Sequence, residues 1–334
     1  MRVAIVGATG AVGAQMLACL EKRCFPVSTL RLFASERSAG RTMPFRGEMI
    51  RVEPVSHEGL QDTDLVLLAA SAEVARAFAP GAMASGALVI DNSSAFRMDP
   101  QTPLVVPEVN GAEALMHSGL IANPNCCAAV AVMALGPLHA QVPIRRVIAA
   151  TYQAASGAGA EAMQELWDST AAYLQGRPYQ PRALAHPYAF NLFSHDSAVE
   201  PESGCNEEEL KLAQELRRLL AAPELKVGVT CVRAPVLRAH TIALNLEFER
   251  PLDPEEALRL LRAAPGVKVV HDPVRNRFPM PSEAAGRDEV LVGRVRRDPS
   301  DPSGRSLALM VAGDQLLKGA ALNAVQIAET LLDR

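Results

Sequence analysis

The first part of the chain alternates short apolar runs of strand character with a segment of helical period. We expect a helix at 11–22 and strands at 2–6, 30–34, 65–69, 87–91 and 120–123. Such alternation is typical of β-α-β units, whose parallel sheet is buried on both faces. The pattern therefore predicts an α/β domain built on a parallel sheet.

The pattern changes after an apolar helix that begins near Cys126. Helices are predicted at 160–174, 207–220 and 254–263, and longer strands at 146–153, 226–233, 240–249, 289–295 and 306–311. Fewer helices between longer strands predict a second, α+β domain with a large mixed or antiparallel sheet. The final segment, 316–332, carries one apolar stripe and predicts a single amphipathic helix.

Length and composition exclude several classes of protein. The 334 residues fit about two domains. With 33 basic and 37 acidic side chains, the formal charge of −4 argues against nucleic acid as a partner. The longest apolar run has ten residues, whereas a membrane span needs about 20, and the first residues resemble no signal peptide, so we expect no membrane partner and a cytoplasmic location. The six cysteines lack C-x-x-C spacing, so neither a disulfide framework nor a metal site is expected.

A glycine-rich loop lies between the first predicted strand and the first predicted helix. Its G-x-x-G-x-x-G spacing removes side chains where a pyrophosphate must approach the backbone, and it directs helix N–H groups at that anion. The alternative is a tight turn without a ligand. The cofactor-binding residues expected here are Gly7, Thr9, Gly10, Ala11, Val12 and Gly13.

The end of the second predicted strand indicates which dinucleotide binds. NAD-binding domains usually place an acidic residue there, to hold the ribose diol. This chain has Ser35, Arg37 and Ser38, whose hydroxyl and guanidinium groups suit a 2′-phosphate. NADP is therefore favoured over NAD, provided that the Glu36 side chain points away.

A second motif, 121–127, reads Ile-Ala-Asn-Pro-Asn-Cys-Cys and leads from a strand into a helix. A thiol at a helix N-terminus is stabilised as the thiolate by the helix dipole, which favours Cys126 as a nucleophile. The alternative for an arbitrary cysteine is simple packing in the core.

These motifs and others downstream resemble the aspartate-β-semialdehyde dehydrogenase family. The ordered set is G-A-T-G-A-V-G, A-N-P-N-C, T-Y-Q-A-A-S-G-A-G (151–159), E-E-L-K (208–211), C-V-R-A-P-V-L-R-A-H (231–240) and K-G-A-A-L-N-A-V-Q (318–326). The resemblance implies a Rossmann-type NADP-binding domain, 1–125 plus 314–334, and a catalytic and dimerisation domain, 126–313. It also implies a homodimer.

The reaction that the resemblance implies is the reductive dephosphorylation of L-4-aspartyl phosphate by NADPH, in lysine, threonine, methionine and diaminopimelate biosynthesis. Cys126 would be the nucleophile that carries the thioester and the thiohemiacetal. His240 matches the family's acid–base histidine, and Gln153 matches the glutamine that orients the acyl intermediate.

The charges of this small-molecule substrate suggest which residues bind it. Arg233 would take the carboxylate, Glu208 the ammonium group, and Lys211 and Arg97 the phosphate, with Asn125 beside the nucleophile. Because Glu208 and Lys211 are three residues apart on one helix, an ordinary ion pair is the alternative for them. The nicotinamide end of the cofactor would meet Ser156, Gly157 and Gln315.

Two other readings remain open. An N-acetyl-glutamyl-phosphate reductase shares the mechanism, but Asn125 and Glu208 argue against it. A catalytically silent relative that acts as a binding or scaffold protein would lose the nucleophile, whereas this chain has Cys126, Gln153, Arg233 and His240. One departure from the family pattern is Cys127, at a position where Ser or Thr is more usual.

Overall fold

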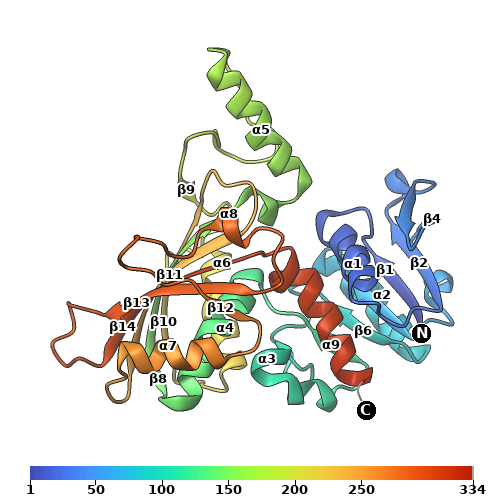
Figure 1. The fold of residues 1–334 in the computed structure, drawn as a ribbon. Coiled ribbons are helices and arrows are strands. Elements are labelled where there is room, and N and C mark those ends of the chain that lie inside the picture. Colours follow the sequence, from blue (N-terminus) through green and yellow to red (C-terminus); the bar gives the residue numbers. More distant parts are fainter. Residues whose placement is uncertain (333–334) are drawn as a thin grey trace. The chain divides into compact units, whose positions relative to one another are not determined.

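The computed structural model describes residues 1–332. The chain forms two compact units, one of Met1–Asn125 with the segment from Ala320 onward and the other of Cys126–Gly319 (Figure 1). The sequence predicted a return to the first unit at residue 314. Residues 314–319 instead belong to the second unit, where Gln315 accepts a hydrogen bond from the Ala239 N–H and Gly319 packs on Cys126.

The first unit is built on a seven-stranded sheet of order β3-β4-β2-β1-β5-β6-β7. All neighbouring strands run parallel except β3 and β4, which form an antiparallel pair. The strands are β1 (Arg2–Val6), β2 (Thr29–Ala34), β3 (Thr42–Phe45), β4 (Glu48–Pro54), β5 (Leu65–Leu68), β6 (Leu88–Asp91) and β7 (Leu120–Ala122). The predicted parallel sheet is confirmed. The β3–β4 pair was not predicted, because most of its residues are exposed and form no buried apolar run.

Among the described residues, four α-helices and three short 3-10 turns complete the first unit. They are α1 (Ala11–Lys22), α2 (Ala72–Ala84), α3 (Pro107–Asn110), α9 (Leu322–Leu332), η1 (Glu36–Ser38), η2 (Glu58–Leu60) and η3 (Gly111–Met116). Helix α9 packs against α1, α3 and β6. The predicted helix at 316–332 is interrupted, because a wider π-helical turn, η5 (Leu317–Ala321), precedes α9 at the boundary between the units.

The second unit is built on a seven-stranded sheet of order β12-β13-β14-β11-β8-β10-β9. The pairs β8–β10 and β12–β13 are parallel and the other pairs are antiparallel, which confirms the predicted mixed sheet. The strands are β8 (Ile144–Gln153), β9 (Phe193–Ser194), β10 (Lys226–Arg233), β11 (His240–Phe248), β12 (Val267–Val269), β13 (Val290–Arg297) and β14 (Ser306–Gly313).

Helices cover one face of this second sheet. They and the remaining helical segments of the unit are α4 (Cys126–Gln141), α5 (Ala160–Leu174), α6 (Glu207–Leu219), α7 (Pro254–Ala263), α8 (Pro281–Ala284) and the 3-10 turn η4 (Ala155–Ala158). Helix α4 lies on the sheet and packs against α6 and α7, and residues are buried on all sides of it. On the other face, Ile148 and Tyr152 of β8 are 44% and 40% exposed. Of the described helices, none is long and apolar enough to cross a membrane.

Candidate active site

The predicted glycine loop joins β1 to α1. Gly7 has a φ of +84°, and a Cβ there would lie 2.3 Å from the Ala69 carbonyl oxygen. A Cβ on Gly13 would lie 2.2 Å from the Gly7 carbonyl oxygen, whereas one on Gly10 would meet only that oxygen, at 3.3 Å. Gly7 and Gly13 are therefore required by close packing. Gly10 immediately precedes α1. The first turn of this helix contains no acidic residue, so the backbone N–H groups of that turn suit a phosphate.

The end of β2 presents the residues expected at the ribose. Ser35, Glu36 and Arg37 are exposed, while Ser38 is buried and donates its backbone N–H to the Ser35 carbonyl. Ser35 precedes the turn η1, which the other three form, in the same unit as the glycine loop.

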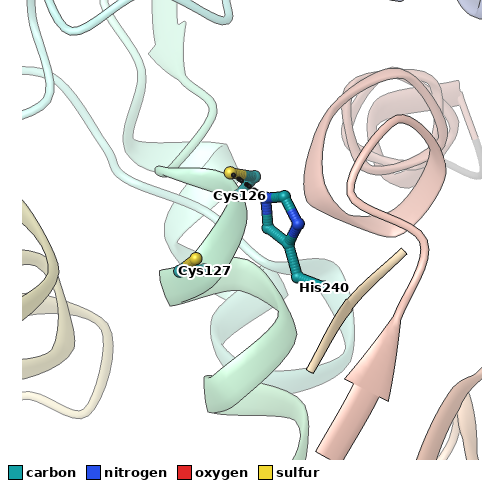
Figure 2. A group of neighbouring side chains, drawn as sticks. All are labelled: Cys126, Cys127 and His240. Atoms are coloured by element: carbon teal, nitrogen blue, oxygen red, sulfur yellow. Dashed lines mark hydrogen bonds between the residues drawn. The ribbon is translucent and has the colours of Figure 1, made fainter. Parts of the chain in front are cut away.

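Cys126 and His240 meet in the second unit (Figure 2). Cys126 begins α4 and is partly exposed, and its Sγ lies 3.4 Å from Nε2 of the fully buried His240, the first residue of β11. The backbone N–H of Ala154 donates to His240 Nδ1 at 3.0 Å. Because Nδ1 acts as an acceptor, the proton of the neutral ring is on Nε2 and faces the sulfur.

Two further thiols lie close to Cys126 and are less suited to nucleophilic attack. A hydrogen bond to Cys126, together with burial, raises the pKa of the Cys127 thiol well above its usual range. Burial raises the pKa of the Cys231 thiol to about 12. Both are fully buried, so Cys126 is the accessible thiol of the three.

Gln153 ends β8 and turns toward α6. Its Nε2 donates to Glu208 Oε1 at 3.2 Å, and both side chains are buried. Lys211 forms a 2.9 Å ion pair with Glu207 on the more exposed side of the same helix. Lys211 therefore pairs with Glu207 and not with Glu208, so the alternative considered for Glu208 and Lys211 is wrong.

Arg233, at the end of β10, is held from one side only. Its Nε donates to Asp196 at 2.9 Å, and its Nη1 is buried with no hydrogen-bond partner among the described residues. Burial acts to raise the pKa of Asp196, but the charge and hydrogen bond of Arg233 outweigh it and lower that pKa. A Cβ on Gly157 would lie 3.3 Å from Arg233 Nη1 and 3.0 Å from His240 Nε2, so the missing side chain leaves space where both groups meet.

Ser156 and Gln315, predicted near the nicotinamide, contact each other. The Gln315 amide donates to Ser156 Oγ, and the Gln315 Oε1 accepts from the Ala239 N–H at 3.0 Å. Both side chains are buried in the second unit, beside the turn that contains Gly157.

Arg97 and Asn125 belong to the first unit. The Arg97 guanidinium donates to the Asn123 carbonyl at 2.9 Å and to the Asn92 carbonyl at 2.7 Å. Those carbonyls follow β7 and β6, so Arg97 is held at the carboxyl edge of the sheet, where ligands of α/β sheets bind. Asn125 is buried and immediately precedes Cys126.

The structure adds three contributors that the sequence did not indicate. Asp196 orients Arg233, the backbone of Ala154 orients His240, and Gly319 packs on the nucleophile. A Cβ on Gly319 would lie 2.9 Å from the Cys126 Cβ. Gly319 stands within one of the motifs quoted above, but its contact with Cys126 has no local signature.

Known proteins match both units. Residues 2–117 match the family model described as semialdehyde dehydrogenase, NAD binding domain, and residues 135–318 match semialdehyde dehydrogenase, dimerisation domain. The aspartate-semialdehyde dehydrogenase of Synechocystis is 50% identical over 334 residues, which cover 100% of this chain and 98% of the relative. That of Bacillus subtilis is 43% identical, with 99% and 97% covered. The structure of aspartate semialdehyde dehydrogenase II complexed with ASA from Vibrio cholerae superposes with a TM-score of 0.95 at 40% identity, covering 99% of this chain and 98% of that one.

The chain belongs to the aspartate-semialdehyde dehydrogenase family. The family resemblance found in the motifs is thereby confirmed. As a member of the aspartate-semialdehyde dehydrogenase family, the chain is an NAD(P)-dependent oxidoreductase of amino-acid biosynthesis. It forms a homodimer, and most of its second unit is matched by the dimerisation domain.

Proposed function

We propose that this chain catalyses the reversible, NADPH-dependent reductive dephosphorylation of L-4-aspartyl phosphate to L-aspartate 4-semialdehyde. The observation that carries the proposal is the group around Cys126, whose Sγ lies 3.4 Å from His240 Nε2. Beside it, Arg233 presents a buried donor that has no partner among the described residues. A nucleophile, a proton carrier and an anion-binding group are what this reaction needs from a protein.

Cys126 carries the acyl group. Its thiolate, favoured by the N-terminus of α4, attacks the acyl carbon, the bond from that carbon to the phosphate oxygen breaks, and a thioester forms. When bound, the reduced dinucleotide supplies the hydride that converts the thioester into a thiohemiacetal. The Nε2–H of His240, whose Nδ1 accepts from Ala154, donates a hydrogen bond to the negatively charged oxygen of that thiohemiacetal. Breaking of the C–S bond re-forms the carbonyl, releases the aldehyde and restores the thiolate of Cys126.

The charged groups of the site fit the two ends of the substrate. Arg233 binds the α-carboxylate with the guanidinium edge that Asp196 leaves open, and Glu208 binds the α-ammonium group. Gln153, bonded to Glu208, orients the acyl group. Arg97, Asn125 and Lys211 are assigned to the phosphate end, and Lys211 must exchange its partly exposed partner Glu207 for that anion.

Arg233→Lys should raise the KM for aspartate semialdehyde by about tenfold or more, because a charge-assisted hydrogen bond is worth about 1.5–3 kcal/mol and Lys lacks the planar fork. The effect on kcat should be smaller. Steady-state kinetics measures both constants, with Arg259→Lys on the exposed face of α7 as the control. An unchanged KM would show that the carboxylate binds elsewhere.

NADP is the dinucleotide we propose for the first unit. The loop from Gly7 to Gly13 fits a pyrophosphate, because Gly10 leaves the start of α1 open. Ser35, Arg37 and Ser38 are proposed to hold the 2′-phosphate. We propose that the nicotinamide end of the cofactor meets Ser156, Gly157 and Gln315. The hydrogen bond from Gln315 to Ser156 holds these two side chains in place.

Arg37→Ala should raise the KM for NADP+ by about tenfold while changing that for NAD+ by less than about twofold, since only NADP+ carries the 2′-phosphate that the guanidinium binds. Parallel titrations of the two cofactors measure the ratio. The control is Arg41→Ala, which removes another exposed cation nearby and so measures the effect of lowering the local positive charge without removing the proposed contact. Equal effects on both cofactors would contradict the assignment.

One assay decides the proposed function. The enzyme should reduce NADP+ when it is given aspartate semialdehyde and phosphate, and it should do so much faster than with NAD+. N-acetyl-glutamate 5-semialdehyde is the informative competitor, because Glu208 has no ammonium group to bind in it. If the enzyme preferred the acetylated aldehyde, it would be an N-acetyl-glutamyl-phosphate reductase and the proposal would be wrong.

The proposal also covers the dimer contact, the two domains and the biosynthetic setting. We assign the dimer contact to the face of the second sheet on which Ile148 and Tyr152 are exposed, because large apolar side chains left exposed on a sheet suit contact with a partner. The NADP-binding domain comprises 1–125 with the C-terminal segment, and the catalytic domain lies between them. Lysine, threonine, methionine and diaminopimelate biosynthesis in the cytoplasm is the proposed setting.

A further inference from the structure

Three potential metal ligands converge at the start of α4. The Sγ atoms of Cys126 and Cys127 and a ring nitrogen of His240 all lie within 4.8 Å of one another (Figure 2). The proposed reaction uses Cys126 and His240 and leaves Cys127 without a task. We propose that Cys126, Cys127 and His240 form a binding site for a thiophilic divalent cation such as Zn²⁺, which reversibly blocks the nucleophile.

The distances suit a small tetrahedral ion. Three atoms within 4.8 Å of one another lie within about 2.8 Å of a common point, and Zn²⁺ binds sulfur at about 2.3 Å and imidazole nitrogen at about 2.0–2.1 Å. On a tetrahedral Zn²⁺ these bond lengths place sulfur and nitrogen about 3.6 Å apart. The Cys126–His240 separation of 3.4 Å is already close to that value, so Cys127 needs only a small movement.

The donor set also suits the ion chemically. Two thiolates and one imidazole are ligands that Zn²⁺ prefers, and they leave a fourth position for water. Two thiolates neutralise the charge of the ion, so the nearby guanidinium of Arg233 adds little Coulomb penalty. Cys126 is partly exposed, which lets an ion reach the site from that side.

Binding must displace protons, and this sets its strength. Cys126 and Cys127 bind the ion as thiolates, so the ion competes with protons for both sulfur atoms. Ligation through His240 Nε2 moves the ring proton to Nδ1 and removes the hydrogen bond from Ala154. The loss of one backbone hydrogen bond costs far less free energy than a complete structural zinc site gains when it binds its ion. We therefore expect reversible binding, weaker than that of a structural zinc site.

Only the expected loss of turnover rests on the proposed function, since metal binding itself can be tested without substrate. Metal-free enzyme is titrated with Co²⁺ and with Zn²⁺. We expect one ion per chain, a thiolate-to-cobalt absorption band with the intensity of two thiolates, and removal of the ion by a chelator. Zn²⁺ should abolish turnover at the same occupancy, and the chelator should restore it.

Cys127→Ala and Cys127→Ser are the decisive variants, because each removes one ligand and leaves the proposed nucleophile in place. Each should keep its turnover in chelator-treated buffer, which also verifies folding. Their affinity for the ion should fall by about 100-fold, the largest loss usual when a residue that hydrogen-bonds to a metal ligand is replaced. The cobalt band should fall to the intensity of one thiolate.

A matched control is Cys205→Ala, which removes a half-buried thiol elsewhere in the second unit and should leave metal binding unchanged. Unchanged affinity in both Cys127 variants would overturn the inference, as would the absence of a cobalt band in the wild type. A wild type that binds the ion but lacks aspartate semialdehyde activity would instead contradict the proposed function and leave the metal site standing.

Discussion

Cys126→Ala should lower turnover by at least about 10⁴-fold, because without the sulfur neither the thioester nor the thiohemiacetal can form. The variant should still fold and bind NADP, since the glycine loop belongs to the other unit of the chain. Steady-state kinetics with aspartate semialdehyde, phosphate and NADP+ measures the loss, and titration with the dinucleotide measures binding separately.

Cys127→Ala is the matched control for this prediction. Its thiol is fully buried and holds its proton firmly, so its removal should leave turnover nearly unchanged and lower the free energy of unfolding by about 1 kcal/mol. If the Cys127 variant were inactive while the Cys126 variant kept its turnover, the nucleophile would be misassigned.

Removal of the chain from Ala320 onward should abolish NADP binding, although it leaves Gly7–Gly13 intact. Helix α9 buries Leu322, Val325 and Ile327 against the first unit. Burial of one large aliphatic side chain contributes about 1.5–3 kcal/mol, and whole domains are stable by only about 5–15 kcal/mol, so the loss of three together should unfold the unit. Thermal unfolding and dinucleotide titration measure the outcome.

Glu329→Gln is the control for this truncation. It breaks the 2.6 Å ion pair between α9 and Arg23, whose side chains are partly exposed, and such pairs contribute about 1 kcal/mol or less. NADP affinity should therefore be retained. A truncated chain that stayed folded and bound NADP with unchanged affinity would show that α9 is dispensable to the nucleotide-binding unit.

The glycine loop shows why part of this protein can be predicted from sequence. A Cβ on Gly13 would collide with the Gly7 carbonyl, only six residues away, so the constraint is local and leaves a fixed spacing in the sequence. The thiol at the start of α4 is equally local, because Asn-Pro-Asn ends the strand before the apolar helix begins.

Helix α6 shows where such prediction stops. The spacing of Glu208 and Lys211 allows an ion pair, yet Glu208 is buried against Gln153, which lies 55 positions away, and Lys211 pairs with Glu207. The packing of α6 against β10 decides which side of the helix turns inward. Likewise, the cysteine spacing excluded a common zinc motif but could not reveal His240, which lies 114 positions from Cys126.

The sequence by itself determined the alternation of buried strands with helices, the glycine loop, the start of the helix at Cys126 and the family, because each depends on short-range spacing or on an ordered set of motifs. Only the tertiary structure decided that Asp196 holds Arg233, that Ala154 orients His240 and that Cys127 shares a site with both catalytic candidates. These contacts depend on the register of the second sheet, in which Arg233 lies beside Gln153 and Thr241 lies opposite Tyr152. Register is set by the burial of whole strands against helices, and no local pattern specifies which distant residues it brings together.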